Sequence, residues 1–99
     1  MFRHVVMFRW TPDAGAEAKA RVASGLAELP DAIDSIRAYR FGSDAGLAEG
    51  NWDFVVVADF DDADGYLVYR DHAAHQSVIT ESIRPILGER AAIQFAPSD

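Results

Sequence analysis

The sequence predicts an α+β fold of the ferredoxin-like kind, in which one antiparallel four-stranded sheet carries its helices on one face. Two observations lead to this prediction. Segments rich in β-branched and aromatic residues alternate with segments whose apolar residues recur every three or four positions, in the order βαββαβ. The chain also has only 99 residues, which fits a single domain over residues 1–99.

The first half of the chain should contain a strand, a helix and a second strand. Residues 2–10 are mostly β-branched and aromatic, which is typical of a strand. Apolar residues then recur at steps of four, four and three at Ala18, Val22, Leu26 and Leu29. This spacing predicts an amphipathic helix over residues 14–29 that ends near Pro30. Residues 36–43 alternate weakly and are expected to form the second strand.

The third strand and a short helix should follow a glycine-containing loop. Residues 52–60 form the most strand-like segment of the chain. We expect Asp61 to be the N-cap of the next helix, with Asp64 completing an acidic capping box. That helix should end at about Arg70.

The C-terminal part should contain a longer helix and the last strand. Val78, Ile79, Ile83, Ile86 and Leu87 recur at spacings near three and four. This pattern predicts a helix over residues 73–87 that Gly88 ends. Residues 89–96 should form the fourth strand.

Both faces of the first and third strands are apolar, which a sheet covered on one face does not require. In the first strand His4, Val6 and Phe8 share one face, but Val5 and Met7 lie on the other. An uncovered second face would expose a larger apolar patch than monomers usually tolerate. We therefore predict a homodimer in which two sheets face each other.

Composition excludes several functions and compartments. The formal net charge of −7 opposes binding to nucleic acid or anionic membranes, and no apolar segment is long enough to span a bilayer. The chain contains no cysteine, so a disulfide scaffold is excluded. A cytoplasmic protein is the expectation.

Three histidines are the natural candidates for proton transfer near neutral pH. His4 lies in the first strand, where it is either a neutral core residue or part of a pocket wall. His72 and His75 are three residues apart and can share one side of a helical turn. Tyr69 shares a face with Tyr66, and its phenol either packs in the core or donates a hydrogen bond within a cavity.

No cofactor or metal is expected. The chain lacks a phosphate loop, a dinucleotide fingerprint and a nucleophile motif. Two histidines at this spacing, without further ligands, are a weak zinc signal.

The chain resembles the stress-responsive A/B barrel (Dabb) family over nearly its whole length. The resemblance rests on the opening run from His4 to Trp10 and on the Tyr-x-x-His-x-x-His block from Tyr69 to His75. It implies a ferredoxin-like protomer whose sheet meets a second sheet to close a dimeric α+β barrel.

Resemblance to the polyketide cyclases of this family implies a cofactor-free aldol mechanism. His75 would then be the general base, Tyr69 would hydrogen-bond a substrate carbonyl, and His4 would help to fix the substrate. The remaining residues expected to contact a ligand are His72, Phe8, Trp10 and Phe54.

Three hypotheses follow. The chain is either a cofactor-free enzyme acting on an apolar, carbonyl-rich ligand inside the barrel, or a non-catalytic binding or stress-associated dimer whose barrel interior is filled. A third alternative is a cofactor-independent quinol-type monooxygenase. Cavity size discriminates between the first two, because an enzyme needs a cavity that reaches His75.

Overall fold

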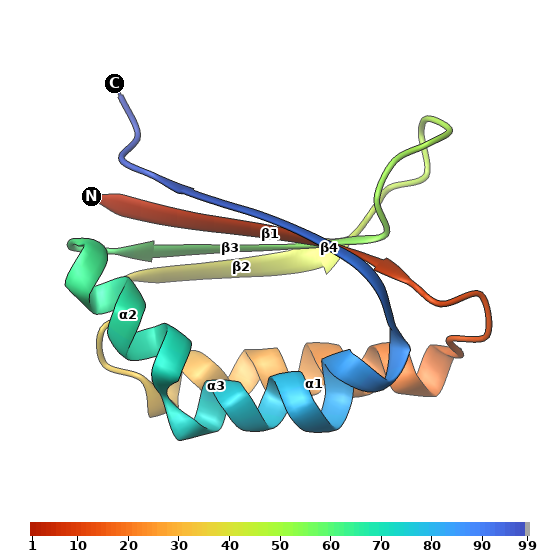
Figure 1. Cartoon of the computed structure of the whole chain (residues 1–99), viewed down its shortest axis with the longest axis horizontal. Coiled ribbons are helices and arrows are strands. Elements are labelled where there is room, and N and C mark those ends of the chain that lie inside the picture. The colour runs from red at the N-terminus through yellow and green to blue at the C-terminus, as the bar shows by residue number, and fades with distance from the viewer. Residues whose placement is uncertain (99) are drawn as a thin grey trace.

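A computed structural model describes residues 1–98 and confirms the predicted ferredoxin-like α+β fold (Figure 1). In chain order the elements are β1 (Phe2–Trp10), α1 (Ala16–Ala32), β2 (Ala38–Ser43), β3 (Phe54–Phe60), α2 (Ala63–Asp71), α3 (Ala73–Val78), η1 (Ile79–Ile83), η2 (Arg84–Ile86) and β4 (Leu87–Phe95). The turn η1 is π-helical and η2 is a 3-10 turn, so the chain stays helical from α3 to the start of β4.

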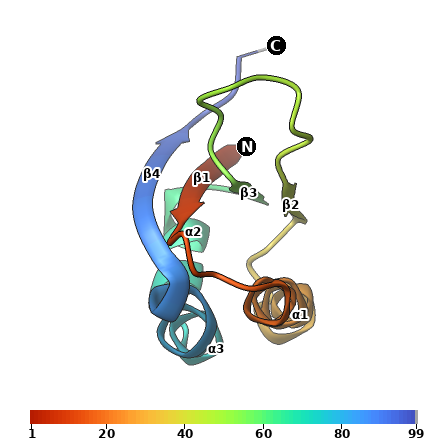
Figure 2. The same cartoon turned by 90° about the vertical axis from the view of Figure 1, so that its right-hand side faces the viewer.

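The strands form one antiparallel sheet in the order β2, β3, β1, β4. All helices lie on the same side of this sheet, with α1 under its β2 side and α3 under its β4 side (Figure 2). The even-numbered residues of β1, β3 and β4 face the helices, and the odd-numbered residues face away. We call these the helix face and the outer face of the sheet.

The hydrophobic core fills the space between the helix face and the helices. Its buried side chains are Val6, Phe8, Val22, Leu26, Leu29, Ile33, Phe54, Val56, Ala58, Phe60, Tyr69, Ile83 and Ile86. None of the helices within residues 1–98 has the length and apolar character that crossing a membrane requires.

Helix α1 runs past its predicted end. Its end was predicted near Pro30, but Pro30 lies within the last turn and the helix ends at Ala32. A proline removes one hydrogen bond from the helical ladder and its ring crowds the carbonyl four residues earlier, but the residues after it can still donate their own bonds. The backbone N–H of Ile33 still donates to the carbonyl of Leu29 at 2.9 Å.

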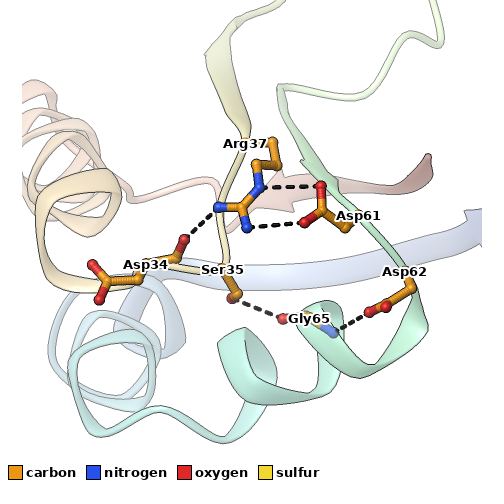
Figure 3. A network of polar contacts seen from close by, with 6 residues as sticks. All are labelled: Asp34, Ser35, Arg37, Asp61, Asp62 and Gly65. Atoms are coloured by element: carbon orange, nitrogen blue, oxygen red, sulfur yellow. Dashed lines mark hydrogen bonds and ion pairs between the residues drawn. The ribbon is translucent and has the colours of Figure 1, made fainter.

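The start of α2 also differs from the prediction (Figure 3). The N-cap is Asp62 and not Asp61, because the Asp62 carboxylate accepts the backbone N–H of Gly65 at 3.0 Å. Asp61 instead pairs with the Arg37 guanidinium through two hydrogen bonds of 3.1 and 2.9 Å. The Ser35 hydroxyl donates to the Gly65 carbonyl at 2.9 Å. These contacts hold the first turn of α2 against the segment that precedes β2.

The helix predicted over residues 73–87 is a regular α-helix only in its first part. Pro85 lacks the N–H that an α-helix would use, and the chain passes through η1 and η2 instead. Gly88 does not end this helix as predicted, because it lies inside β4. A Cβ atom at Gly88 would lie 3.0 Å from the carbonyl oxygen of Arg9, beside the irregular register between Arg9 and Trp10. Glycine therefore permits the close approach of β4 to β1.

The outer face of the sheet has no covering element within residues 1–98 (Figure 1). Its apolar residues are Val5, Met7, Val55, Val57, Ala91, Ile93 and Phe95. Met7, Ile93 and Phe95 are 36%, 60% and 41% exposed. The second apolar face predicted from the strand pattern is therefore present and open.

Candidate functional site

A cavity of about 150 Å³ lies between the helix face of the sheet and the helices. Its apolar wall includes Val6, Phe8 and Val56 from the sheet, Leu26 from α1, and Ile79 and Ile83 from η1. An apolar cavity of roughly this volume accommodates a single benzene ring. The space therefore suits the body of a small apolar ligand.

The cavity brings the three predicted catalytic residues together. His4 comes from β1, Tyr69 from α2 and His75 from α3, and all three border the cavity. The Tyr69 and His75 rings are in contact at a tilt of 31° with centroids 4.0 Å apart, and the His4 and Tyr69 centroids are 6.1 Å apart. Phe8, one of the expected ligand contacts, also lines the cavity.

The other expected ligand contacts do not line this cavity. His72 is the N-cap of α3, where its Nδ1 accepts the backbone N–H of Ala74 at 3.0 Å. Trp10 and Phe54 pack against Phe8 with ring centroids 5.3 and 6.4 Å from it. They support the cavity wall from behind.

The cavity also lies in a different place from the one expected. The ligand was expected inside a barrel closed by two sheets, but the cavity lies within one chain. The reason is that His4 is on the helix face, where its ring lies 4.9 Å from that of Tyr66 on α2. The face that could meet a second sheet is the opposite one.

His75 is held in the tautomer that a general base needs. Its Nδ1 lies 3.1 Å from the backbone carbonyl of Arg70, which can only accept a hydrogen bond. The proton of the neutral ring therefore lies on Nδ1, and Nε2 keeps its lone pair. Burial lowers the pKa of His75, although the hydrogen bond to Arg70 opposes this shift. The imidazole is therefore neutral at pH 7.

Tyr69 is a buried hydrogen-bond donor with a phenolic partner. Its hydroxyl lies 2.9 Å from the hydroxyl of Tyr39 on β2. Burial raises the pKa of Tyr39 to about 12, and burial together with the neighbouring Tyr39 raises the pKa of Tyr69 further. Both phenols therefore keep their protons at neutral pH. If Tyr39 donates to Tyr69, the Tyr69 proton is free for a ligand oxygen.

His4 is a neutral histidine with the opposite tautomer. The side-chain amide nitrogen of Gln94 lies 2.8 Å from His4 Nδ1, and since an amide NH₂ only donates, Nδ1 is the acceptor. The proton of His4 is therefore on Nε2. Burial, with a smaller effect of the Arg90 charge, lowers the pKa of His4 to about 4. His4 therefore acts as a hydrogen-bond donor at neutral pH and does not act as a base.

The buried His4 makes stability dependent on pH below neutrality. The pKa of His4 is about 4 in the folded state against 6.5 for a free histidine, so the unfolded chain binds the extra proton. Stability should fall as the pH drops from 6.5 towards 4, with His4 contributing a loss of about 3 kcal/mol. Urea unfolding between pH 7 and 4 measures this loss, and His4→Gln should flatten the profile. An NMR titration placing the His4 pKa near 6.5 would contradict the prediction.

Gln94 and Arg90, both on the helix face, were not predicted from the sequence as site residues. Gln94 pairs with His4 and Arg90 pairs with Phe8 in the β1–β4 register, and Arg90 borders the cavity. The alternation of side chains along β4 indicates part of this arrangement. Residues 90, 92 and 94 lie on one face of the strand, and the apolar residues that include Ile93 lie on the other. The sequence does not give the register that brings them to His4.

The fold and the cavity define a class of protein: a single ferredoxin-like protomer with a small internal cavity and an uncovered apolar sheet face. The sequence model of the Stress Responsive A/B Barrel Domain family, Dabb, matches residues 2–97. The chain therefore belongs to the Dabb family. The search of curated proteins found no match.

Three solved structures illustrate how widely this fold is used. A dimeric ferredoxin-like protein of unknown function from Thermobifida fusca is 43% identical, with a TM-score of 0.90 over 97% of this chain and 90% of that one. A Dabb family protein from Mesorhizobium loti is 18% identical, with a TM-score of 0.80 over 99% and 97% of the two chains. A hydroxynitrile lyase from Passiflora edulis is 12% identical, with a TM-score of 0.86 over 99% and 94%. The two distant similarities support the fold alone.

Proposed function

We propose that this chain binds a small apolar carbonyl compound in the cavity and removes a proton from the carbon next to the carbonyl, without a cofactor. The observation that carries the proposal is the fixed tautomer of His75. Its Nδ1 is held by the Arg70 carbonyl, so the basic Nε2 belongs to a neutral ring bordering an apolar cavity. A neutral imidazole with an unprotonated ring nitrogen can accept this proton.

The proposed step moves one proton. The lone pair of His75 Nε2 takes the proton from the α-carbon, the electrons of the broken C–H bond form an enolate, and the ring becomes an imidazolium. The enolate oxygen accepts the hydrogen bond of the Tyr69 hydroxyl, which Tyr39 supports from 2.9 Å. His4 donates from Nε2 and orients the ligand. The resemblance to polyketide cyclases supports the same roles for His75, Tyr69 and His4.

The second candidate function is ligand binding without catalysis. It is supported by the predominantly apolar wall and by the neutral state of His4, which favour retention of an apolar molecule. Both candidates require a ligand in the cavity, but only the first requires proton exchange at a ligand carbon.

Deuterium exchange separates the two candidates. The protein is incubated in D₂O with 1-phenylbutane-1,3-dione, and the loss of the central C–H signal is followed by NMR above the uncatalysed rate. Exchange that saturates with ligand concentration is expected. Binding seen by chemical-shift changes at Tyr69 and His75 without faster exchange would instead favour the non-catalytic candidate.

We also propose that the chain is a homodimer in which two outer faces meet to close an α+β barrel. The apolar outer face supports this assembly, and the 43% identical Thermobifida fusca protein is described as dimeric. Arg3 and Asp59 on this face neutralise each other through two hydrogen bonds of 2.7 and 2.9 Å, and Arg40, opposite Val57, is a further charge on it. A second copy would cover Met7, Ile93 and Phe95.

A further inference from the structure

Two arginines border the cavity, and no carboxylate is part of its lining. The chain has 16 Asp and Glu residues against nine Lys and Arg, and its formal net charge is −7. The cavity wall nevertheless contains two arginines, Arg70 and Arg90, and no carboxylate. The permanently charged side chains in this lining are therefore both cationic, which favours a negative group there over a positive one.

The two arginines differ in whether they form an ion pair within the chain. The guanidinium of Arg70 forms two hydrogen bonds with the carboxylate of Asp71, at 2.9 and 3.1 Å, so its charge is already neutralised. Arg90 has no ion-pair partner within residues 1–98. Arg90 is therefore the charge at this cavity that remains available to a ligand.

Arg90 places this charge at the solvent-exposed border of a mainly apolar space. Arg90 lies on β4 opposite Phe8, on the strand that forms an edge of the sheet, and it is exposed. Its charge also acts inside the cavity, because it lowers the pKa of both His4 and His75. An apolar body inside and a cation at the accessible edge complement a molecule with one apolar end and one anionic end.

We propose that the ligand of this cavity is a small apolar carboxylic acid whose carboxylate pairs with Arg90. The planar guanidinium matches a carboxylate through two parallel hydrogen bonds. The cavity volume of about 150 Å³ limits the apolar part to about one aromatic ring or a short alkyl chain. This inference deepens the proposed function and rests on ligand binding in the cavity, but it does not require proton abstraction.

A matched pair of probes tests the proposal. Benzoate and benzamide have nearly the same size and shape, but only benzoate is charged at pH 7. Calorimetric titration of the wild-type protein should show at least about tenfold tighter binding of benzoate, since charge-assisted hydrogen bonds are the stronger kind. Arg90→Gln should abolish this preference, and Arg70→Gln should keep it because the Arg70 side chain is already paired. Thermal unfolding checks that both variants are folded.

NMR titration of the histidine rings supplies a second readout. Bound benzoate should raise the pKa of His75 because it compensates the Arg90 charge, whereas benzamide should leave that pKa unchanged. In the free Arg90→Gln variant the pKa of His4 and of His75 should rise. Equal binding of the two probes, or a benzoate preference that survives Arg90→Gln, would overturn the carboxylate proposal alone. Failure of both probes to bind would overturn the ligand-binding function with it.

Discussion

Replacing His75 with glutamine should slow deuterium exchange in 1-phenylbutane-1,3-dione by about 10²- to 10⁴-fold, the usual contribution of a positioned general base. The glutamine amide can still donate to the Arg70 carbonyl, so the local backbone contact is conserved. It has no basic nitrogen, and the proton of the α-carbon then has no acceptor. The exchange rate at saturating ligand is the measurement.

His72 provides the matched control for this variant. It lies three positions from His75, but it caps α3 through the backbone N–H of Ala74 and does not border the cavity. Asparagine is a good N-cap residue, so His72→Asn should preserve both the helix and the exchange rate. Equal losses in the two variants would show that His75 has no special role and would contradict the proposed mechanism.

A charge introduced on the outer face should dissociate the proposed dimer. Ile93 is 60% exposed in the single chain, so Ile93→Glu leaves the protomer core intact. In a two-fold interface each substitution occurs twice, and each buried carboxylate costs at least about 2 kcal/mol when unpaired. The dimer dissociation constant should therefore increase by about 1,000-fold. Size-exclusion chromatography with light scattering at micromolar concentration measures the change.

Val68 serves as the control for the dimer variant. It is a comparably apolar residue, 55% exposed, but it lies on α2 on the other side of the sheet. Val68→Glu should leave the dimer unchanged. The wild-type protein should also show a melting temperature that rises with protein concentration, as expected when association stabilises the fold. A wild-type monomer at micromolar concentration would refute the homodimer.

The strands were predictable because their signal is local. The β-branched and aromatic runs at residues 2–10 and 52–60 contain β1 and β3, and their two apolar faces already indicated an uncovered second face. Helix boundaries were less predictable because two neighbouring residues can each serve as the N-cap. Asp61 and Asp62 are chemically equivalent as N-cap residues. The Arg37 side chain, 24 residues from Asp61, pairs with the Asp61 carboxylate, so Asp62 caps the helix.

The candidate site was predictable as a set of residue types, and His4, Tyr69 and His75 were named from the sequence. Only the tertiary structure showed that these three border one cavity within the chain, while Trp10, Phe54 and His72 do not line it. It also decided the protonation chemistry, since the Arg70 carbonyl and the Gln94 amide select opposite tautomers in His75 and His4.

Sequence alone therefore determined the fold class, the family resemblance and the chemistry available to the chain, because periodicity and side-chain type are local properties. The tertiary structure decided which of these side chains lie next to one another. The pairing of β1 with β4 brings Gln94 to His4 and Arg90 to Phe8, although these partners are separated by most of the chain. Register depends on the simultaneous packing of all four strands and the helices, and no single segment encodes it.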